Sequence, residues 1–411
     1  MARATRDSMS TWMGQTRNWR IVSARSMFNR FFQRLSMPYD SIYIIELGAN
    51  PFHLGLVNGI SNVMGVFISA PFGWLQDRYS LRRIFLIGVL MSLAASSIYA
   101  VATDWMMIIP AMLLSTLALR VGSCLTICDV SVKNEDRSTC KGICDGLFAT
   151  PSLVAPTLAA LVITHFGGIS SSGIRPLYWI QLAAGTVLFL LLATQLKEIE
   201  RSKAKNKFGF VGDFREVFTR GTALKRWIVL DVVTTFSTAM VAPFTQPFAY
   251  EIKGAEQFIL GGMITADLTV QVLLSPLLGN VPDRTGRKRV IYMLEPSYWA
   301  SILVLVFAPS PGFLIISSIL GGFRAIAMYV SVTPLMVERV PIECIGRWRG
   351  ILGLFEALVS VPAPLIGGIV WETIGPSYLF LIPVLISMLV RIPLLATIPE
   401  ETRSKIDASS L

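Results

Sequence analysis

Long apolar runs separated by short polar segments fill the chain from residue 21 to residue 398. A bilayer core about 30 Å thick needs about 20 helical residues at about 1.5 Å each. Strands of a transmembrane barrel would alternate apolar and polar side chains about every second residue, and these runs do not alternate. The pattern therefore predicts twelve transmembrane helices. Their expected spans are 21–46, 52–75, 83–103, 105–131, 142–166, 176–196, 226–250, 256–280, 289–308, 311–337, 348–371 and 375–398.

One long polar stretch interrupts the interior of the chain and leaves six expected helices on each side. The basic residues gather in segments that would then share one side of the membrane, which by the positive-inside rule predicts that both termini are cytoplasmic. The expected parts are a cytoplasmic N-terminal tail (1–20), an N-terminal six-helix bundle (21–196), a cytoplasmic linker (197–225), a C-terminal six-helix bundle (226–398) and a cytoplasmic C-terminal tail (399–411).

The two halves resemble each other at an offset of about 206 residues, which indicates an internal repeat. Gly-Ala pairs, prolines and a mid-helix arginine recur in the same order on equivalent helices, with Arg120 matching Arg324. The clearest match joins Gly73, Asp77, Arg78 and Arg83, after the second helix, to Gly279, Asp283, Arg284 and Arg289, after the eighth.

The segment Gly279-x-x-x-Asp-Arg-x-Gly-Arg-Lys288 resembles the signature loop of the major facilitator superfamily. The first copy departs from it, with Ser80 in place of glycine and Leu81 in place of a basic residue. The resemblance implies an all-α membrane protein of two pseudo-symmetric six-helix bundles. It also implies that the first, fourth, seventh and tenth helices line a central cavity.

Composition agrees with a membrane protein and excludes several other classes. The chain is 53% hydrophobic and 15% charged, against about 25% charged for soluble domains. The net charge of +10 comes from basic residues near predicted helix ends, so we expect no nucleic-acid partner. The five cysteines lie in apolar or cytoplasmic segments and are expected to be reduced thiols. No cleavable signal peptide is visible.

The signature segments predict a gate on the cytoplasmic side. Gly73 and Gly279 are expected to end helices where neighbours approach closely. Asp77 and Asp283 can accept hydrogen bonds from the N-terminus of a neighbouring helix. The gate's remaining members are expected to be Arg78, Arg83, Arg284, Gly286 and Arg287, with Asp129 and Glu338 as acidic partners. The alternative is that the basic residues only set the topology.

Charged side chains within the expected spans predict a substrate site, because intramembrane charge is costly and usually functional. The candidates are Arg30, Arg34, Arg120 and Arg324, with Asn58 added from the second helix. Guanidinium groups bind carboxylate or phosphate bidentately, so these arginines could hold an anionic substrate. Alternatively, they form internal ion pairs with acids from the set Asp40, Asp231, Asp267, Glu295 and Glu356.

Three intramembrane acids, Asp267, Glu356 and Asp231, are the candidates for a coupling proton. Asp267 begins a polar stripe that continues to Gln271 on the same helix face. The alternative for each acid is an ordinary interhelical hydrogen bond.

The sequence thus predicts a secondary active transporter that works by alternating access and is coupled to protons. Its substrate would be an organic anion or metabolite, or a drug-like solute, and the alternative is a membrane-embedded sensor that retains the fold. We expect no enzyme and no cofactor, because no phosphate loop, metal-ligand set or nucleophile–base pair is present. The expected partners are membrane lipid, a small-molecule substrate and protons, with the protein a monomer.

Overall fold

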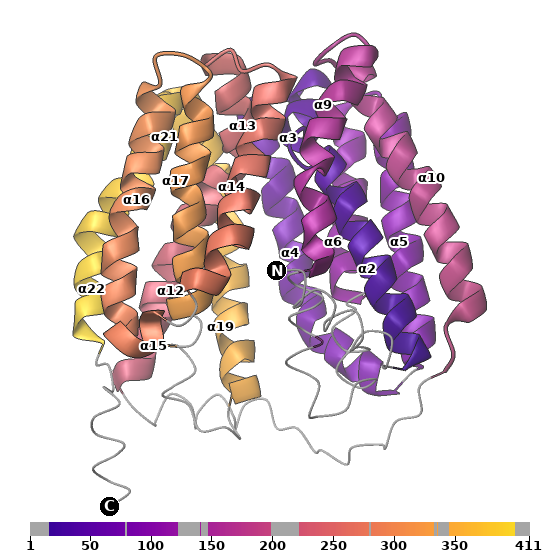
Figure 1. Cartoon of the computed structure of the whole chain (residues 1–411), viewed down its shortest axis with the longest axis horizontal. Helices are drawn as coiled ribbons and strands as arrows, with labels where there is room; N and C mark the ends of the chain where they lie inside the picture. Colours follow the sequence, from indigo (N-terminus) through magenta and orange to yellow (C-terminus); the bar gives the residue numbers. More distant parts are fainter. Residues whose placement is uncertain are drawn as a thin grey trace, which may run out of the picture. The chain divides into compact units, whose positions relative to one another are not determined.

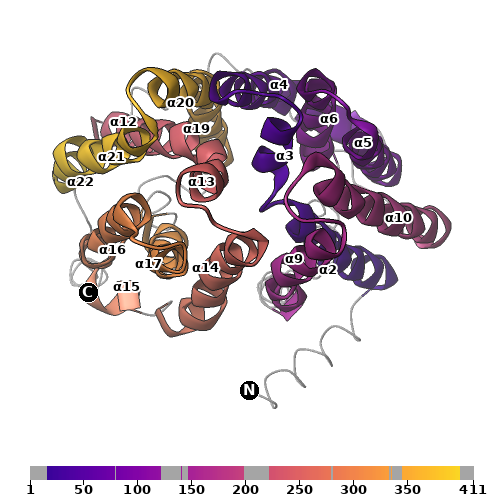
Figure 2. The ribbon, with the colours of Figure 1, turned by 90° about the horizontal axis from the view of Figure 1, so that it is seen from above.

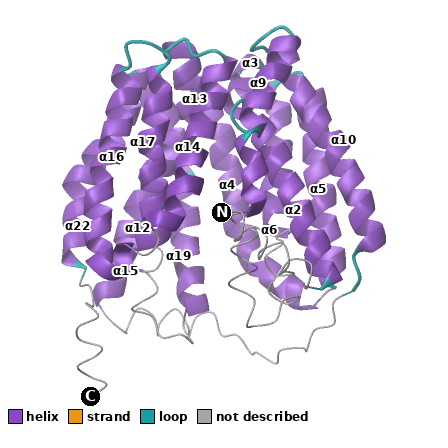
Figure 3. Cartoon of the chain, in the orientation of Figure 1, coloured by secondary structure: helices purple, strands orange, loops and turns teal. Residues whose placement is uncertain are grey.

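The computed structural model describes residues 16–78, 80–121, 140, 147–198, 222–278, 281–332, 335 and 345–398. Within these ranges the regular elements are all helices (Figure 3). Seven of the described helices are long and apolar enough to cross a membrane, and three shorter apolar helices accompany them. Each expected span overlaps at least one described helix. The protein is an all-α membrane protein, as predicted.

The chain divides into two compact units. Unit 1 contains residues 1–205 and 256–265, and unit 2 contains residues 206–255 and 266–411. The short segment 256–265 joins unit 1 through specific contacts. Tyr39 donates a hydrogen bond to the Gln257 backbone carbonyl at 2.8 Å, and a Cβ atom on Gly261 would lie 2.7 Å from the Pro156 carbonyl oxygen. Glycine is therefore needed for this close approach.

Unit 1 is built around α5 (Leu81–Val101), which packs against α6 (Ile108–Val121) and α10 (Ser171–Gln195), while α2 (Arg17–Ser36) packs against α9 (Ala155–His165) and α10 (Figures 1 and 2). Val22, Phe85 and Leu192 form a buried apolar cluster that joins α2, α5 and α10. Its elements are α2 (Arg17–Ser36), α3 (Asp40–Glu46), α4 (Pro51–Arg78), α5 (Leu81–Val101), η1 (Trp105–Met107), α6 (Ile108–Val121), η3 (Leu147–Leu153), α9 (Ala155–His165) and α10 (Ser171–Gln195).

In unit 2, α16 (Arg287–Phe307) packs along α17 (Phe313–Ala327), and α12 (Thr222–Val241) packs against α19 (Ile345–Ser360) and α20 (Pro362–Thr373). Trp227, Ile291, Trp348 and Leu395 belong to a buried cluster that joins α12, α16, α19 and α22. The elements after unit 1 are α12 (Thr222–Val241), η4 (Ala242–Phe244), α13 (Thr245–Pro247), η5 (Phe248–Ile252), α14 (Gln257–Leu278), α15 (Val281–Thr285), α16 (Arg287–Phe307), α17 (Phe313–Ala327), η6 (Met328–Val332), α19 (Ile345–Ser360), α20 (Pro362–Thr373), α21 (Pro376–Ile386), η8 (Ser387–Arg391) and α22 (Ile392–Thr397).

Prolines divide two spans that the sequence predicted as single helices. The first span is two helices, α2 and α3, with Pro38 between them. The eleventh span is α19 followed by α20, which begins at Pro362. Proline lacks a backbone N–H and its ring crowds the preceding turn, which weakens the helix at these two positions, although Pro176 and Pro296 lie inside the continuous helices α10 and α16.

Candidate proton and substrate site

A buried ion pair lies inside unit 2 between α16 and η8. Nη1 of Arg391 contacts Oε1 of Glu295, and the two side chains are only 8% and 2% exposed. Ser387 Oγ donates a second hydrogen bond to the same oxygen at 2.6 Å, and Trp299 Nε1 donates to Ser387 Oγ at 3.1 Å. Both charges therefore have partners, as charges in a low-dielectric interior require.

Arg324, on α17, has neutral partners in the same unit. Its guanidinium carbon lies 3.8 Å from the centroid of the Tyr298 ring, and Nη2 donates to Thr238 Oγ1 at 3.0 Å. Arg391 is close enough to repel it electrostatically. Among the described side chains the ion pair of this cluster is Arg391–Glu295, and no carboxylate pairs with Arg324. The cluster of Glu295, Arg391 and Arg324 therefore carries a net charge of +1 when all three are ionised.

Asp231 on α12 and Glu356 on α19 form a carboxyl pair. Their side chains are close enough to interact electrostatically. Oδ2 of Asp231 is buried and has no hydrogen-bond partner among the described residues. Two carboxyl groups that lie together repel each other when both are ionised, which favours a single proton on the pair. This pair is therefore suited to bind and release a proton.

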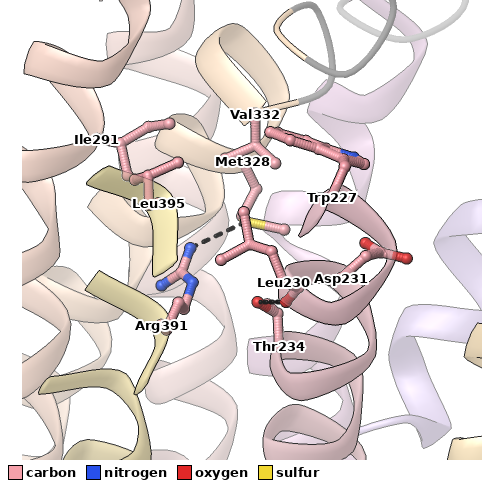
Figure 4. A pocket seen from close by; sticks show the side chains of 9 residues that line it. All are labelled: Trp227, Leu230, Asp231, Thr234, Ile291, Met328, Val332, Arg391 and Leu395. Atoms are coloured by element: carbon pink, nitrogen blue, oxygen red, sulfur yellow. Dashed lines mark hydrogen bonds between the residues drawn. The ribbon is translucent and has the colours of Figure 1, made fainter. Parts of the chain in front are cut away.

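A small cavity adjoins Asp231 and Arg391 (Figure 4). Its volume is about 10 Å³, roughly what a single water molecule needs. Figure 4 shows the Asp231 carboxyl pointing away from Arg391, whose Nη2 lies 3.7 Å from Met328 Sδ. The cavity is thus large enough for water but not for an organic solute.

Of the three acids expected to bind protons, Asp267 has a different environment from Asp231 and Glu356. Gln271 Nε2 donates to Asp267 Oδ2 at 2.8 Å, so the polar stripe predicted on this helix face contains a hydrogen bond. The carboxyl–carboxyl contact involves the other two candidates, which the sequence had proposed separately.

The remaining substrate candidates lie in unit 1. Arg30 and Arg34 are one helical turn apart on α2, and Arg34 Nη1 lies 2.9 Å from Met37 Sδ. The Asn58 side chain donates to the Leu54 backbone carbonyl at 2.9 Å. Arg120 lies on α6, with its side chain outside the described residues. That these arginines surround one substrate together with Arg324 therefore stays a prediction.

The first signature segment is helical rather than a loop. The expectation that Gly73 ends the second helix is wrong, because α4 continues to Arg78. No proline interrupts these turns, so the backbone hydrogen bonds continue through Asp77 and Arg78. Arg83 is exposed in the first turn of α5.

In the second signature segment, Asp283 and Arg284 belong to the short helix α15, and Arg287 begins α16. Asp129, Gly279 and Glu338 lie outside the described residues, as do the side chains of Asp77, Arg78, Asp283 and Arg284. The expected charge pairing at this gate therefore stays a prediction.

The departure of Ser80 from the repeat has a structural reason. Gly286 precedes α16 with a φ of +96°, a conformation that glycine adopts without strain. Ser80 precedes α5 with a φ of −57°, and its hydroxyl accepts a hydrogen bond from the Arg83 backbone N–H. The two halves thus begin equivalent helices in different ways, one with a glycine conformation and one with a side-chain cap.

Two basic residues beside the signature segments bind helix ends within their own units. Arg82 Nη2 donates to the Ala193 carbonyl at 2.7 Å, and Lys288 Nζ donates to the Ala396 carbonyl at 3.3 Å. These positions are 206 residues apart, so the contacts are equivalent in the two halves. A cation satisfies the free carbonyls at a helix C-terminus. The candidates for the gate did not include either residue.

Arg391 is the member of the unit 2 site that the sequence analysis did not propose. A signal was present, because an arginine inside the expected span 375–398 is costly in lipid. Its partner Glu295, 96 residues away, had been considered only as a partner for other arginines.

Comparison with known proteins agrees with the repeat and with the fold. The family model described as Major Facilitator Superfamily matches residues 22–248 and 227–410 of this chain. This protein belongs to the Major Facilitator Superfamily. Multidrug resistance protein MdtG of Salmonella arizonae is 23% identical over 354 residues, which cover 83% of this chain and 85% of the relative. MdtG of Salmonella typhimurium is 23% identical over a stretch of the same length.

Solved structures of superfamily transporters share the fold. The crystal structure of the nucleoside transporter NupG has a TM-score of 0.72 at 15% identity, covering 91% of this chain and 98% of that one. A bacterial homologue of the human lysosomal transporter Spinster, inward-facing and unoccupied, has a TM-score of 0.62 at 15% identity, covering 92% and 94%. Membership in this superfamily makes the chain a multi-pass membrane transport protein.

Proposed function

We propose that this superfamily member is a proton-coupled secondary transporter that moves a small organic solute by alternating access. The observation that carries the proposal is the Asp231–Glu356 carboxyl pair. A shared proton on two carboxyls is lost or gained as the surroundings change, and that is the chemistry a proton-driven transporter needs.

The location of the pair also supports coupling. Asp231 lies on the seventh expected helix and Glu356 on the eleventh, nearer to the ends that we propose face the cytoplasm. The adjoining cavity is about 10 Å³, which leaves room for about one water molecule beside this part of α12. We propose that both termini are cytoplasmic, because basic residues concentrate on that side.

Named relatives support a small organic solute as the cargo. MdtG is named for multidrug resistance, and NupG is a nucleoside transporter. Both names agree with the classes proposed from the sequence, a drug-like solute or an organic metabolite.

The test is flux into proteoliposomes under an imposed pH gradient, with a panel of radiolabelled nucleosides, drug-like solutes and organic anions. We expect gradient-driven flux of at least one class, and its loss in Asp231→Asn and in Glu356→Gln. Glu372→Gln is the matched control, because this glutamate is exposed near the end of α20. Flux that does not respond to the gradient, or that survives both substitutions, would refute proton coupling through this pair.

A further inference from the structure

We propose that Arg324 binds the anionic group of the substrate, a carboxylate or phosphate on a small organic molecule, and that the proton on the Asp231–Glu356 pair controls this binding. The inference rests on the proposed function and adds the charge of the substrate. It makes the protein a symporter, in which an organic anion and a proton bind together.

Arg324 faces an aqueous space rather than lipid. It lies at the middle of the expected span 311–337. Its side chain is half-buried, and its hydrogen bond to Thr238 is exposed. A guanidinium at this depth is too costly to face hydrocarbon, so its exposed edge must line a water-filled space.

Among the described residues, the partners of Arg324 are neutral and leave the other in-plane N–H groups of its guanidinium available to an anion. Tyr298 covers one face of the guanidinium plane, while Thr238 takes one of its in-plane donors. A stacked guanidinium keeps its other in-plane N–H groups, which match the two oxygens of a carboxylate or phosphate. Glu295, the nearby acid, is already paired with Arg391.

Asp231 and Thr238, which accepts a hydrogen bond from Arg324, lie on the same face of α12. Asp231 and Thr238 are seven residues apart, which is two helical turns and about 10 Å along the axis. A charge on the pair therefore acts on Arg324 along one helix face. At an effective dielectric constant of about 20, one added charge about 10 Å away changes anion affinity roughly tenfold.

Among the described residues, few other charged groups lie near the pair. Glu356 on α19 lies beside Asp231, and Arg391 on η8 lies across the cavity with its charge balanced by Glu295. α20 and α21 carry Glu372 and Tyr378 at exposed positions near helix ends, and α22 has no titratable residue.

The charge states determine the direction of coupling. With one shared proton, the pair has a charge of −1, which Arg324 balances. Loss of that proton to water changes the charge of the pair from −1 to −2. The second negative charge then competes with a substrate anion for the positive charge of Arg324. Proton and anion therefore favour each other's binding, and the coupling is reciprocal.

The experiment uses the full-length protein and three probes that share one ring but differ in charge: benzoate, benzamide and benzylammonium. Phenyl phosphate and short-chain carboxylates extend the anion set. Binding is measured at pH 6 and pH 8, and gradient-driven uptake is measured in proteoliposomes. We expect anions to bind roughly tenfold more tightly at pH 6, and benzamide and benzylammonium to bind at neither pH.

Variants separate the two parts of the site. Arg324→Gln should abolish anion binding at both pH values. Arg324→Lys should retain part of it, because lysine keeps the positive charge but lacks the two parallel N–H donors of a guanidinium. Asp231→Asn with Glu356→Gln should keep the high affinity at both pH values. Arg17→Gln, at the exposed start of α2, is the control that should change nothing.

Three outcomes would overturn the inference: no anion of the set binds, benzamide or benzylammonium binds better than benzoate, or Arg324→Gln binds anions as the wild type does. Gradient-driven flux of a neutral or cationic solute alone would leave the proposed function standing and remove only the anion site. Absence of gradient-driven flux for every solute tested would instead remove the proposed function.

Discussion

The buried pair of Glu295 and Arg391 predicts an unequal response to neutralising each partner. In Glu295→Gln the guanidinium of Arg391, 8% exposed, loses its counter-charge. Arginine cannot release its proton, so the charge stays buried. Breaking a buried pair in this way costs about 3–5 kcal/mol of unfolding free energy.

The opposite substitution, Arg391→Met, should cost less. The glutamate can take up a proton and become neutral, and Ser387 still donates its hydrogen bond at 2.6 Å. The double variant Glu295→Gln with Arg391→Met leaves no unpaired charge. We therefore expect it to be more stable than Glu295→Gln alone, with a coupling energy of about 2 kcal/mol between the two positions.

The assay is unfolding of the purified protein in detergent micelles, followed by tryptophan fluorescence, for the wild type, both single variants and the double variant. Glu372→Gln serves as the control for loss of an exposed glutamate. The reasoning fails if the two single changes simply add in the double variant. It also fails if the unfolding free energy of Glu295→Gln lies within about 0.5 kcal/mol of the wild-type value, because a buried unpaired arginine should cost more than that.

Two other predictions follow from helix contacts and from the repeat. Arg82→Ala removes the cation at the end of α10 and should lower unfolding free energy by about 1 kcal/mol, measured by thermal unfolding, while Arg83→Ala, exposed in the same turn, should not. Equal effects of the two substitutions would contradict this role. Arg120→Ala should abolish gradient-driven flux in proteoliposomes without changing expression, if Arg120 matches Arg324 in function as it does in the repeat. Unchanged flux would remove Arg120 from the substrate site.

Much of the fold could be predicted from the sequence because lipid imposes a simple rule. Every backbone group in hydrocarbon must be hydrogen-bonded within its own helix, so apolar runs of sufficient length are helices. Helix ends were less predictable. The signature glycine at Gly73 suggested an end, but nothing in the following turns stops α4 before Arg78.

The candidate site was predictable residue by residue, but its pairings were not. Intramembrane charge alone identified Asp231, Glu356 and Arg324, because the cost of burying charge makes each one conspicuous. The same rule could have found Arg391. Which acid meets which base depends on distances between helices that are far apart in the sequence.

By itself the sequence determined that this protein is a helical membrane protein with an internal repeat and charged side chains inside its spans. Hydropathy, charge placement and repeat spacing are properties of the chain, so they need no coordinates. Only the tertiary structure decided that Glu295 pairs with Arg391, that Asp231 lies against Glu356, and that Arg324 has neutral partners. The physical reason is range: ion pairs and hydrogen bonds act over a few ångströms, and helix packing alone brings residues so distant in sequence to that distance.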